Sequence, residues 1–328
     1  MKIAFIHQKM MSFIKKDLDI LAGNHEVENI EINSFLPTVS LYNAVLNSDL
    51  VFCWFGKMQA FWAVLFAKIL NKKTIVVAGG DDVANEAAIA YGLYTKWWKK
   101  WVPNYVFNNC DFILAVSEYN RNEVIKNTGV SSDKVSVIYH GFIDEIKENA
   151  TKQAQVITVG RITRETIVKK GLTLFVEAAI LLKDVKFILI GPCNDGSVNI
   201  IKNNAPGNVT FSGGVYGDEL NEWYSDSKIY LQASYHESFG CSVAEAMLGG
   251  CIPVVSRRAA LPEVVGDTGI YIEEQTPEAV AEAIKKSLIL PDNYGLKARQ
   301  RIIEYFPLKK RKEALLKAVD DVMNGVYG

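Results

Sequence analysis

Two carboxylates, Glu237 and Glu245, lie eight residues apart in this chain. A glycine-containing turn separates them, a β-prone apolar run precedes the turn, and helix-forming residues follow it. Backbone N–H groups around Phe239, Gly240 and Cys241, together with the helix start, would suit a phosphate. Carboxylates beside such a site accept hydrogen bonds from hydroxyl groups. The segment therefore predicts a site for a ligand that joins phosphate to many hydroxyls, such as a sugar nucleotide.

Each carboxylate also has a simpler interpretation. Ser242 and Glu245 form the pattern Ser-x-x-Glu, a capping box in which the glutamate satisfies only the first N–H groups of its own helix. Glu237 has no such role, but a glutamate in a loop is most often simply solvated. On spacing alone, both the ligand and the capping interpretations of Glu245 stay open.

A cluster of cations follows another β-prone run. Gly160 and Arg161 end that run, and Lys169 and Lys170 follow a polar loop at the start of a helix. Arg161 and Lys170 can point into the same crevice as Glu237, because ligands of α/β sheets bind beyond the carboxyl ends of the strands. Two cations would stabilise the charge that develops on a diphosphate leaving group. The alternative is a solvated basic loop.

Length and composition indicate a two-domain globular protein. The chain has 328 residues, of which 49% are hydrophobic and 22% are charged. Its net charge of −1 hides no asymmetry, since residues 1–150 carry 15 Lys and Arg against 16 Asp and Glu. This balance argues against nucleic acid as a partner.

Cysteine usage and the amino terminus favour a cytoplasmic protein. The five cysteines are scattered and include no Cys-x-x-Cys pair, which is typical of reduced thiols. Residues 1–7 run straight into a strand and lack the features of a signal peptide. The longest apolar helix-like stretch, 58–70, is too short to span a bilayer. We therefore expect a soluble protein, with peripheral contact at the inner membrane face left open.

Short β-prone runs alternate with helix-like stretches along the whole chain, which favours two parallel sheets covered by helices. We expect strands near residues 2–7, 25–31, 49–54, 73–78, 111–116, 135–139, 155–159, 186–190, 208–212, 228–234, 252–256 and 269–272.

The polar segment 144–154 carries no apolar periodicity and divides the two halves. We expect an amino-terminal Rossmann-like domain over 1–146 and a second one over 155–305. The helix at 306–328, after a break at Phe306-Pro307, could pack back on the first domain. Two sheets in two domains predict a cleft between them that closes by hinge motion.

Two features of the first half have open interpretations. In Gly79-Gly80-Asp81-Asp82, either aspartate could orient a hydroxyl or act as a base, or the run could be only a turn with a helix cap. The stretch from Tyr91 to Phe107 interleaves tryptophans with lysines. That pattern suits a membrane interface and a lipid-linked acceptor, but the tryptophans could equally pack inside the domain.

Several of these motifs together resemble the nucleotide-sugar domain of group 1, or family 4, retaining glycosyltransferases of the GT-B fold. The resemblance rests on Gly160-Arg161, Lys170-Gly171, Glu237-Ser-Phe-Gly with Glu245, and Leu261-Pro262-Glu263-Val264-Val265. It extends forward to the segments 111–118 and 140–144, which look like the end of the family's first domain.

The resemblance implies a role for each matched residue. Arg161 and Lys170 would hold the diphosphate of the donor, with Lys169 as the alternative because the loop is longer than in the family. Glu237 would contact hydroxyls of the transferred sugar, and Glu245 those of the ribose. The backbone at residues 239–241 would reach the sugar and the phosphate.

The family also implies transfer with retention to an acceptor hydroxyl, without a metal or another cofactor. The acceptor, a glycan or a lipid-linked molecule, is not readable from the chain. Ala259-Ala260 stands where the family usually has glycines, and the turn with Asp82 lacks the family's histidine. Alternatives are a nucleotide-sugar epimerase of similar architecture and a non-catalytic sugar-nucleotide-binding protein.

Overall fold

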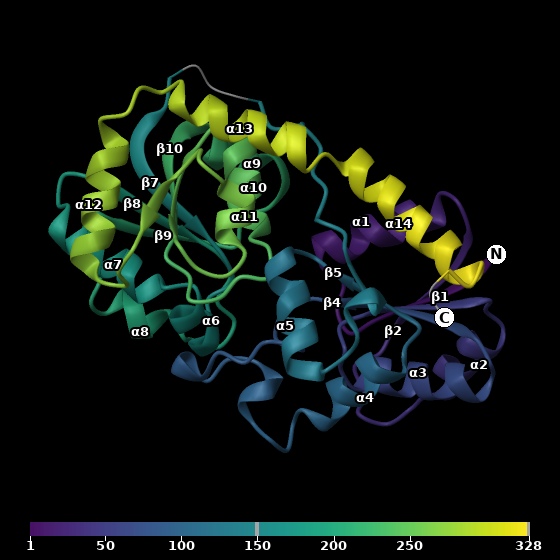
Figure 1. Ribbon diagram of the computed structural model, residues 1–328. Coiled ribbons are helices and arrows are strands. Elements are labelled where there is room, and N and C mark those ends of the chain that lie inside the picture. Colours follow the sequence, from purple (N-terminus) through teal and green to yellow (C-terminus); the bar gives the residue numbers. More distant parts are fainter. Residues whose placement is uncertain (148–150, 327–328) are drawn as a thin grey trace. The chain divides into compact units, whose positions relative to one another are not determined.

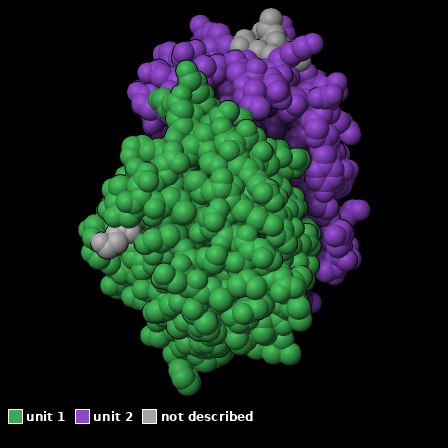
Figure 2. All heavy atoms as spheres, turned by 90° about the vertical axis from the view of Figure 1, so that its right-hand side faces the viewer, with its two compact units in different colours: residues 1–141, 308–328 green, residues 142–307 purple. Residues whose placement is uncertain are grey.

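The computed structural model of the chain describes residues 1–147 and 151–326. It consists of two compact units, which are coloured separately in Figure 2. Unit 1 comprises residues 1–141 and 308–328, and unit 2 comprises residues 142–307. The chain thus leaves unit 1 after Gly141, before the polar segment expected as the boundary. Residues 148–150 of that segment lie outside the described residues.

Unit 1 is built on a six-stranded parallel sheet with helices (Figure 1). Its strands are β1 (Lys2–His7), β2 (Glu26–Glu31), β3 (Leu50–Trp54), β4 (Lys73–Ala78), β5 (Phe112–Ala115) and β6 (Val135–Val137). Its α-helices are α1 (Ser12–Ala22), α2 (Val39–Leu46), α3 (Met58–Ile69), α4 (Trp101–Asn109), α5 (Glu118–Thr128) and α14 (Leu308–Met323).

Unit 2 repeats this plan with a second six-stranded parallel sheet. Its strands are β7 (Gln153–Val159), β8 (Lys186–Ile190), β9 (Val209–Gly213), β10 (Ser227–Gln232), β11 (Ile252–Ser256) and β12 (Ile270–Ile272). Its helices are α6 (Arg164–Lys169), α7 (Leu172–Leu181), α8 (Val198–Lys202), α9 (Gly217–Asp226), α10 (Cys241–Leu248), α11 (Leu261–Val265), α12 (Pro277–Leu288) and α13 (Tyr294–Tyr305).

The strand orders show where each sheet offers a crevice. The order in unit 2 is β12-β11-β10-β7-β8-β9, so the chain progresses outward in both directions from the neighbours β7 and β10. The order in unit 1 is β2-β1-β3-β4-β5-β6, and the corresponding reversal falls between β1 and β3. Ligands of open α/β sheets bind at such switch points, outside the carboxyl ends of the strands. The expected ligand crevice of unit 2 therefore lies beyond β7 and β10.

The sheets form because their strands are apolar runs that helices cover on both faces. All five residues of β3 are buried, as are four of the five in β8. Every strand expected from the sequence overlaps an observed one, so the prediction of two parallel α/β sheets is confirmed. The helix after the break at Phe306-Pro307 is also present, as α14.

A buried ion pair fastens α14 to the rest of unit 1. Arg311 donates from Nε and Nη2 to the two carboxylate oxygens of Asp17 on α1, at 2.6 and 2.7 Å. Its Nη1 donates to the carbonyl oxygens of Ile138 and Tyr139, at 2.8 Å each. Among the described residues, no helix combines the length and the apolar character needed to cross a bilayer.

Candidate functional site

The site lies at the carboxyl ends of β7 and β10, the two central strands of unit 2. These strands pair in parallel, with Ile157 beside Tyr230. Gly160 and Arg161 directly follow β7, and Glu237 lies in the turn between β10 and α10. The cation and carboxylate clusters expected from the sequence therefore come from neighbouring strands at the switch point of the sheet.

An ion pair between Lys170 and Glu237 is the centre of this site. The ammonium nitrogen of Lys170 lies 3.0 Å from Oε1 of Glu237, and the two side chains are only 16% and 12% exposed. Burial lowers the pKa of Lys170, but the adjacent carboxylate of Glu237 and the nearby Tyr230 and Cys241 together offset burial and leave this pKa raised. Burial raises the pKa of Glu237, but the charges of Lys170 and Lys169, the hydrogen bond from Lys170 and the neighbouring His236 together offset burial and leave this pKa lowered. Each partner thus favours the charged form of the other.

Two glycines make room for this pair. Gly171, the N-cap of α7, has a φ of +66°, and a Cβ on it would lie 2.2 Å from the carbonyl oxygen of Ala233. A Cβ on Gly160 would lie 2.9 Å from Cδ of Lys170. Only glycine combines the left-handed backbone with this close approach. The motifs Gly160-Arg161 and Lys170-Gly171 therefore bring the lysine alongside the end of β10.

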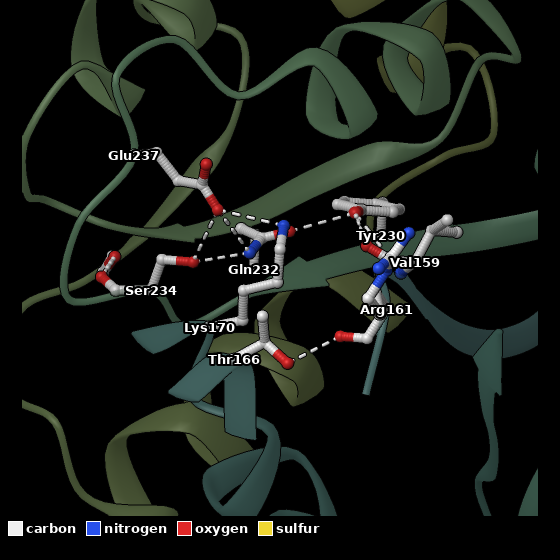
Figure 3. Close-up of polar contacts among 9 residues, drawn as sticks. Val159, Arg161, Thr166, Lys170, Tyr230, Gln232, Ser234 and Glu237 are labelled. Atoms are coloured by element: carbon white, nitrogen blue, oxygen red, sulfur yellow. Dashed lines mark hydrogen bonds and ion pairs between the residues drawn. The ribbon is translucent and has the colours of Figure 1, made fainter. Parts of the chain in front are cut away.

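Three polar side chains extend from alternate positions at the end of β10, and alternate residues of a strand share one face. The amide of Gln232 accepts from the hydroxyl of Tyr230 at 3.0 Å and donates to Ser234 Oγ and, at 3.2 Å, to Glu237 Oε1. Ser234 Oγ also donates to Glu237 Oε1, at 3.2 Å. Burial raises the pKa of Tyr230 to about 12, so its hydroxyl stays protonated. Figure 3 shows this polar chain ending at Glu237.

Gln232 and Ser234 are site residues that the sequence analysis misses. Both are buried, at 1% and 0% exposure. The signal that could have identified them is the alternation Tyr-x-Gln-x-Ser at the end of an otherwise apolar strand, because a buried polar side chain needs a hydrogen-bond partner.

The two oxygens of Glu237 have different surroundings. Oε1 accepts from Lys170, Gln232 and Ser234. Oε2 makes no hydrogen bond within residues 1–147 and 151–326, and Figure 3 shows it directed away from these three side chains. Such a carboxylate is fixed in position by one oxygen and can accept from a ligand hydroxyl with the other.

The structure distinguishes the cations of this site. Lys170 contacts Glu237 through its ammonium group. The backbone carbonyl oxygen of Lys169 accepts a hydrogen bond from the N–H group of Tyr235 at 2.8 Å. The guanidinium of Arg161 is exposed and forms no ion pair with a described residue. The polar loop expected after Arg161 is mostly the helix α6, which starts with a capping box of Thr163 and Thr166.

Glu245 lies on α10, but the capping-box interpretation is wrong. The helix begins at Cys241 with Gly240 as its N-cap and has no side-chain cap, so Ser242 is already inside the first turn. Oε2 of Glu245 instead accepts from the hydroxyl of Tyr224 at 3.4 Å. A half-buried carboxylate that is not used as a cap is compatible with ligand contact.

Phe239 contributes its ring to the interior of unit 2. The ring is 2% exposed and lies 5.9 Å from Phe142 and 5.3 Å from Phe306, measured between ring centroids. This aromatic packing anchors the turn that carries Glu237 and Gly240.

The expectation that Asp82 meets an acceptor or acts as a base is contradicted by its geometry. Asp82 is fully buried, and its carboxylate accepts from the backbone N–H groups of Gly56, Gly79 and Gly80 at 2.8, 3.1 and 2.8 Å. Burial, followed by the charge of Asp81, raises the pKa of Asp82 to about 6. This carboxylate holds the turns after β3 and β4 together.

In the described part of the chain, no cluster of three or more acidic, histidine or cysteine side chains is arranged to hold a metal ion.

Two family models match the chain. The model of glycosyl transferases group 1 matches residues 153–289, and that of Glycosyltransferase Family 4 matches residues 32–145. The first match contains the whole site around Lys170 and Glu237. Together the two matches cover more than two thirds of the chain.

Curated relatives are distant. A 41.2 kDa protein of the cps region of Klebsiella pneumoniae is 26% identical over 69% of this chain and 65% of its own length. A glycosyltransferase of Methanocaldococcus jannaschii is 26% identical over 79% of this chain and 71% of its own length. The chain thus spans about two thirds of the length of these relatives.

Solved structures support the same fold. The Anabaena protein HepE, in complex with UDP and glucose, matches 98% of this chain and 100% of its own, with a TM-score of 0.80 and 16% identity. Such low identity speaks for the fold alone. With two matching family models and this fold, the chain belongs to the group 1 and family 4 glycosyltransferases, enzymes of the GT-B fold.

Proposed function

We propose that this protein transfers a sugar from a nucleotide-diphosphate sugar to an acceptor hydroxyl, with retention of the anomeric configuration. The observation that carries the proposal is the Lys170–Glu237 pair, which offers a cation and an open carboxylate oxygen at the switch point of unit 2. A diphosphate needs the first and a sugar hydroxyl needs the second.

The donor would bind in the crevice beyond the carboxyl ends of β7 and β10. Arg161 and Lys170 bind the diphosphate, Glu237 Oε2 accepts from a hydroxyl of the sugar, and Glu245 accepts from the ribose. The start of α10 adds partial positive charge near Gly240. HepE, which has the same fold, has been solved with UDP-glucose, and this supports a nucleotide sugar as the ligand.

The proposed reaction needs no protein nucleophile. Three donors hold Oε1 of Glu237, so this residue orients the sugar and does not attack it. The bond between the anomeric carbon and the diphosphate breaks while the acceptor oxygen bonds to the same face of the sugar. The acceptor proton passes to the departing diphosphate oxygen. Arg161 and Lys170 offset the charge that develops on the diphosphate, and no metal is required.

Two other functions make different predictions. An epimerase would convert the donor without an acceptor, and a binding protein would bind it without turnover. Neither is favoured by a particular contact of the site, since no acid–base pair flanks the open oxygen of Glu237 among the side chains that contact it.

The first experiment identifies the donor. Thermal unfolding is followed with UDP, GDP, ADP and their sugar conjugates, because a ligand that binds the folded state raises the melting temperature. The stabilising conjugate is then incubated with glycan and lipid-linked acceptors, with and without EDTA. We expect transfer in both conditions and a product of unchanged anomeric configuration by proton NMR. An inverted product would contradict retention.

The second experiment tests the site residues. Glu237→Ala and Arg161→Ala should each lower transfer by at least about 100-fold, because each removes an interaction with the reacting donor. Glu282→Ala and Arg164→Ala are matched controls on exposed side chains of unit 2 and should retain activity. Full activity of either site variant would refute the assignment.

A further inference from the structure

One surface of unit 1 gathers exposed apolar side chains from three segments around α2, α3 and α4. We call it the aromatic face; its exposed members are Phe35, Leu36, Val39, Tyr42, Leu46, Ile69, Trp97, Trp98 and Trp101. Helix α3 contacts both α2 and α4, and Figure 1 shows the three helices beside one another. Large contiguous apolar surfaces of this kind mark interaction sites.

Ring contacts join the two ends of the aromatic face. Tyr42 on α2 packs against Phe66 on α3, with ring centroids 5.4 Å apart, and Phe66 lies 6.2 Å from Trp62. Trp62 lies 5.1 Å from Phe61, which lies 5.4 Å from Trp101 on α4. The face is therefore one continuous band of half-buried and exposed rings.

The outward side of α3 is apolar as well. Its partly exposed or exposed positions include Phe61, Trp62, Leu65, Phe66 and Ile69, which recur at helical spacing. A helix packed on a sheet normally presents polar residues to water on this side. Here a second apolar side faces outward, beside α2, α4 and the segment before α2, where Trp62 Nε1 donates to the carbonyl oxygen of Phe35 at 3.0 Å.

The segment from Lys96 to Trp101 reads Lys-Trp-Trp-Lys-Lys-Trp, and all six residues are exposed. Trp97 is 77% exposed and Trp98 is 55% exposed. The alternative that these tryptophans pack inside the domain is therefore wrong. An indole exposed beside lysines offers an apolar body with cations close by.

Lysines outnumber acidic residues in the part of unit 1 that carries the aromatic face. The segment 34–110 contains seven lysines against four acidic residues, Asp49, Asp81, Asp82 and Glu86, although the whole chain has a net charge of −1. Two of these lysines, Lys57 and Lys73, pair with Asp81 and Asp111. The other five, Lys68, Lys72, Lys96, Lys99 and Lys100, form no ion pair with a described residue.

We propose that the aromatic face docks on the surface of an anionic lipid bilayer. Tryptophan prefers the interface between headgroups and acyl chains, and lysines are attracted to anionic headgroups. A protein partner fits less well, because lysine is depleted at protein interfaces. A second copy of the chain would bring two sets of unpaired lysines against each other at a two-fold interface.

Vesicle flotation tests this docking directly. The full chain is mixed with vesicles of phosphatidylcholine, alone or with 30% phosphatidylglycerol, and bound protein is measured at low and high salt. We expect binding to the anionic vesicles only, weakened by salt because the lysine contribution is screened. Docking requires neither donor nor acceptor, so the result is independent of transfer.

Two variants separate the contributions. Lys96→Gln/Lys99→Gln/Lys100→Gln should lower the partition coefficient on the order of 100-fold, since each lysine near the surface contributes about fivefold. Trp97→Ala/Trp98→Ala should lower it at least about 10-fold and reduce the quenching of tryptophan fluorescence by brominated lipid, with Trp101 remaining as a weaker reporter on the face. Both segments are exposed, so melting temperatures should stay unchanged.

Matched controls use exposed side chains away from the aromatic face. Lys309→Gln/Lys310→Gln/Lys312→Gln on α14 removes the same charge, and Tyr216→Ala/Ile289→Ala removes exposed apolar groups of unit 2. Both controls should bind vesicles nearly as well as the original chain. Equal losses in the controls, or no binding by the original chain, would overturn the proposal. Self-association that the two tryptophan substitutions abolish, without vesicle binding, would instead assign the face to a second copy.

Discussion

Each unit contains a buried or nearly buried ion pair, and the two pairs differ in what they leave unsatisfied. In unit 1, both carboxylate oxygens of Asp17 accept from Arg311, whose third nitrogen binds two carbonyl groups. In unit 2, Glu237 uses one oxygen for Lys170, Gln232 and Ser234 and keeps the other open. The Asp17–Arg311 pair therefore leaves no carboxylate oxygen open for a ligand, whereas the Lys170–Glu237 pair leaves one. A pair whose oxygens are all hydrogen-bonded can only stabilise the fold, but a pair with an open oxygen can also bind a ligand.

The switch points of the two sheets differ in the same way. Beyond β7 and β10 lie exposed or partly exposed charges, Arg161, Lys170 and Glu237. Near β1 and β3 the polar groups are instead enclosed: His7, the last residue of β1, is 1% exposed, and the carboxylate of Asp82, after β4, accepts from the backbone N–H groups of Gly56, Gly79 and Gly80. Similar sheets thus carry a candidate polar ligand site in one unit and a carboxylate used for backbone contacts in the other.

The largest effect should come from breaking the pair of unit 1. Arg311→Met leaves Asp17 buried without its partner, and we expect a loss of about 3–5 kcal/mol in the free energy of unfolding, measured with urea. Lys309→Met on the same helix is the control, because Lys309 is 84% exposed. A loss below about 1 kcal/mol for Arg311→Met would show that the pair does not fasten α14.

The next largest effect should be a pH dependence of stability that arises from His140 in unit 1. Burial, then the charges of Arg311 and Lys16, hold the pKa of His140 well below its usual range. Below pH about 6.5 the unfolded chain therefore binds a proton at His140 that the folded chain does not bind. This histidine alone should lower the free energy of unfolding by up to about 1.4 kcal/mol per pH unit as pH decreases from there towards its folded pKa. Asp82, whose pKa burial raises to about 6, contributes in the opposite direction below that pH.

The variant His140→Phe isolates this contribution, since it keeps an aromatic ring between Phe13 and Trp54. Between pH 6.5 and 5, the free energy of unfolding of the original chain should fall relative to that of the variant, because both proteins keep the contribution of Asp82 and only the original chain has that of His140. Glu237 adds nothing in this window, because its lowered pKa confines its loss of stability to more acidic solution. Parallel pH curves for the two proteins would contradict the account of His140.

Breaking the Lys170–Glu237 pair of unit 2 should lower the free energy of unfolding less than breaking the Asp17–Arg311 pair, but it should weaken ligand binding. Lys170→Met leaves Glu237 with the donors Gln232 and Ser234 and with some access to water, so we expect a loss of about 1 kcal/mol. Binding of the nucleotide sugar should fall at least 10-fold by calorimetry. Lys183→Met, on an exposed lysine of unit 2, should change neither quantity. A stability loss as large as that of Arg311→Met would make the pair structural.

The smallest effect concerns backbone strain near the site. Ala259 has a φ of +52°, the left-handed region that favours glycine. Ala259→Gly should raise the free energy of unfolding by about 0.5 kcal/mol, because relief of strain exceeds the entropy that glycine adds to the unfolded chain. Ala260, with a φ of −80°, is the matched control, and its change to glycine should be destabilising. The opposite order would show that no strain resides at Ala259.

The strands and the sheet class were within reach of the sequence because apolar β-prone runs mark parallel strands directly. Helix α6 could not be predicted from the sequence, because its residues Arg-Glu-Thr-Ile-Val-Lys show too little apolar periodicity to be told from a polar loop. The capping box at Ser242 failed for a related reason. Its pattern fits a helix beginning at Val243, two residues later than Cys241, and helix ends are poorly marked by spacing alone.

The site residues divide in a similar way. Arg161, Lys170 and Glu237 are candidates from the sequence because charged residues at strand ends are conspicuous in an apolar context. Gln232 and Ser234 were missed because they lie within or next to the apolar strand that defines β10. Asp82 was misjudged because no pattern shows that three backbone N–H groups converge on its carboxylate.

Calorimetric titration tests the central claim, that unit 2 holds the donor with separate residues for phosphate and sugar. The stabilising nucleotide diphosphate and its sugar conjugate are each titrated into the original chain, Arg161→Ala and Glu237→Ala. We predict that Arg161→Ala weakens both ligands at least 10-fold, whereas Glu237→Ala weakens only the sugar conjugate. Equal weakening of both ligands by Glu237→Ala, or of neither, would contradict the assignment.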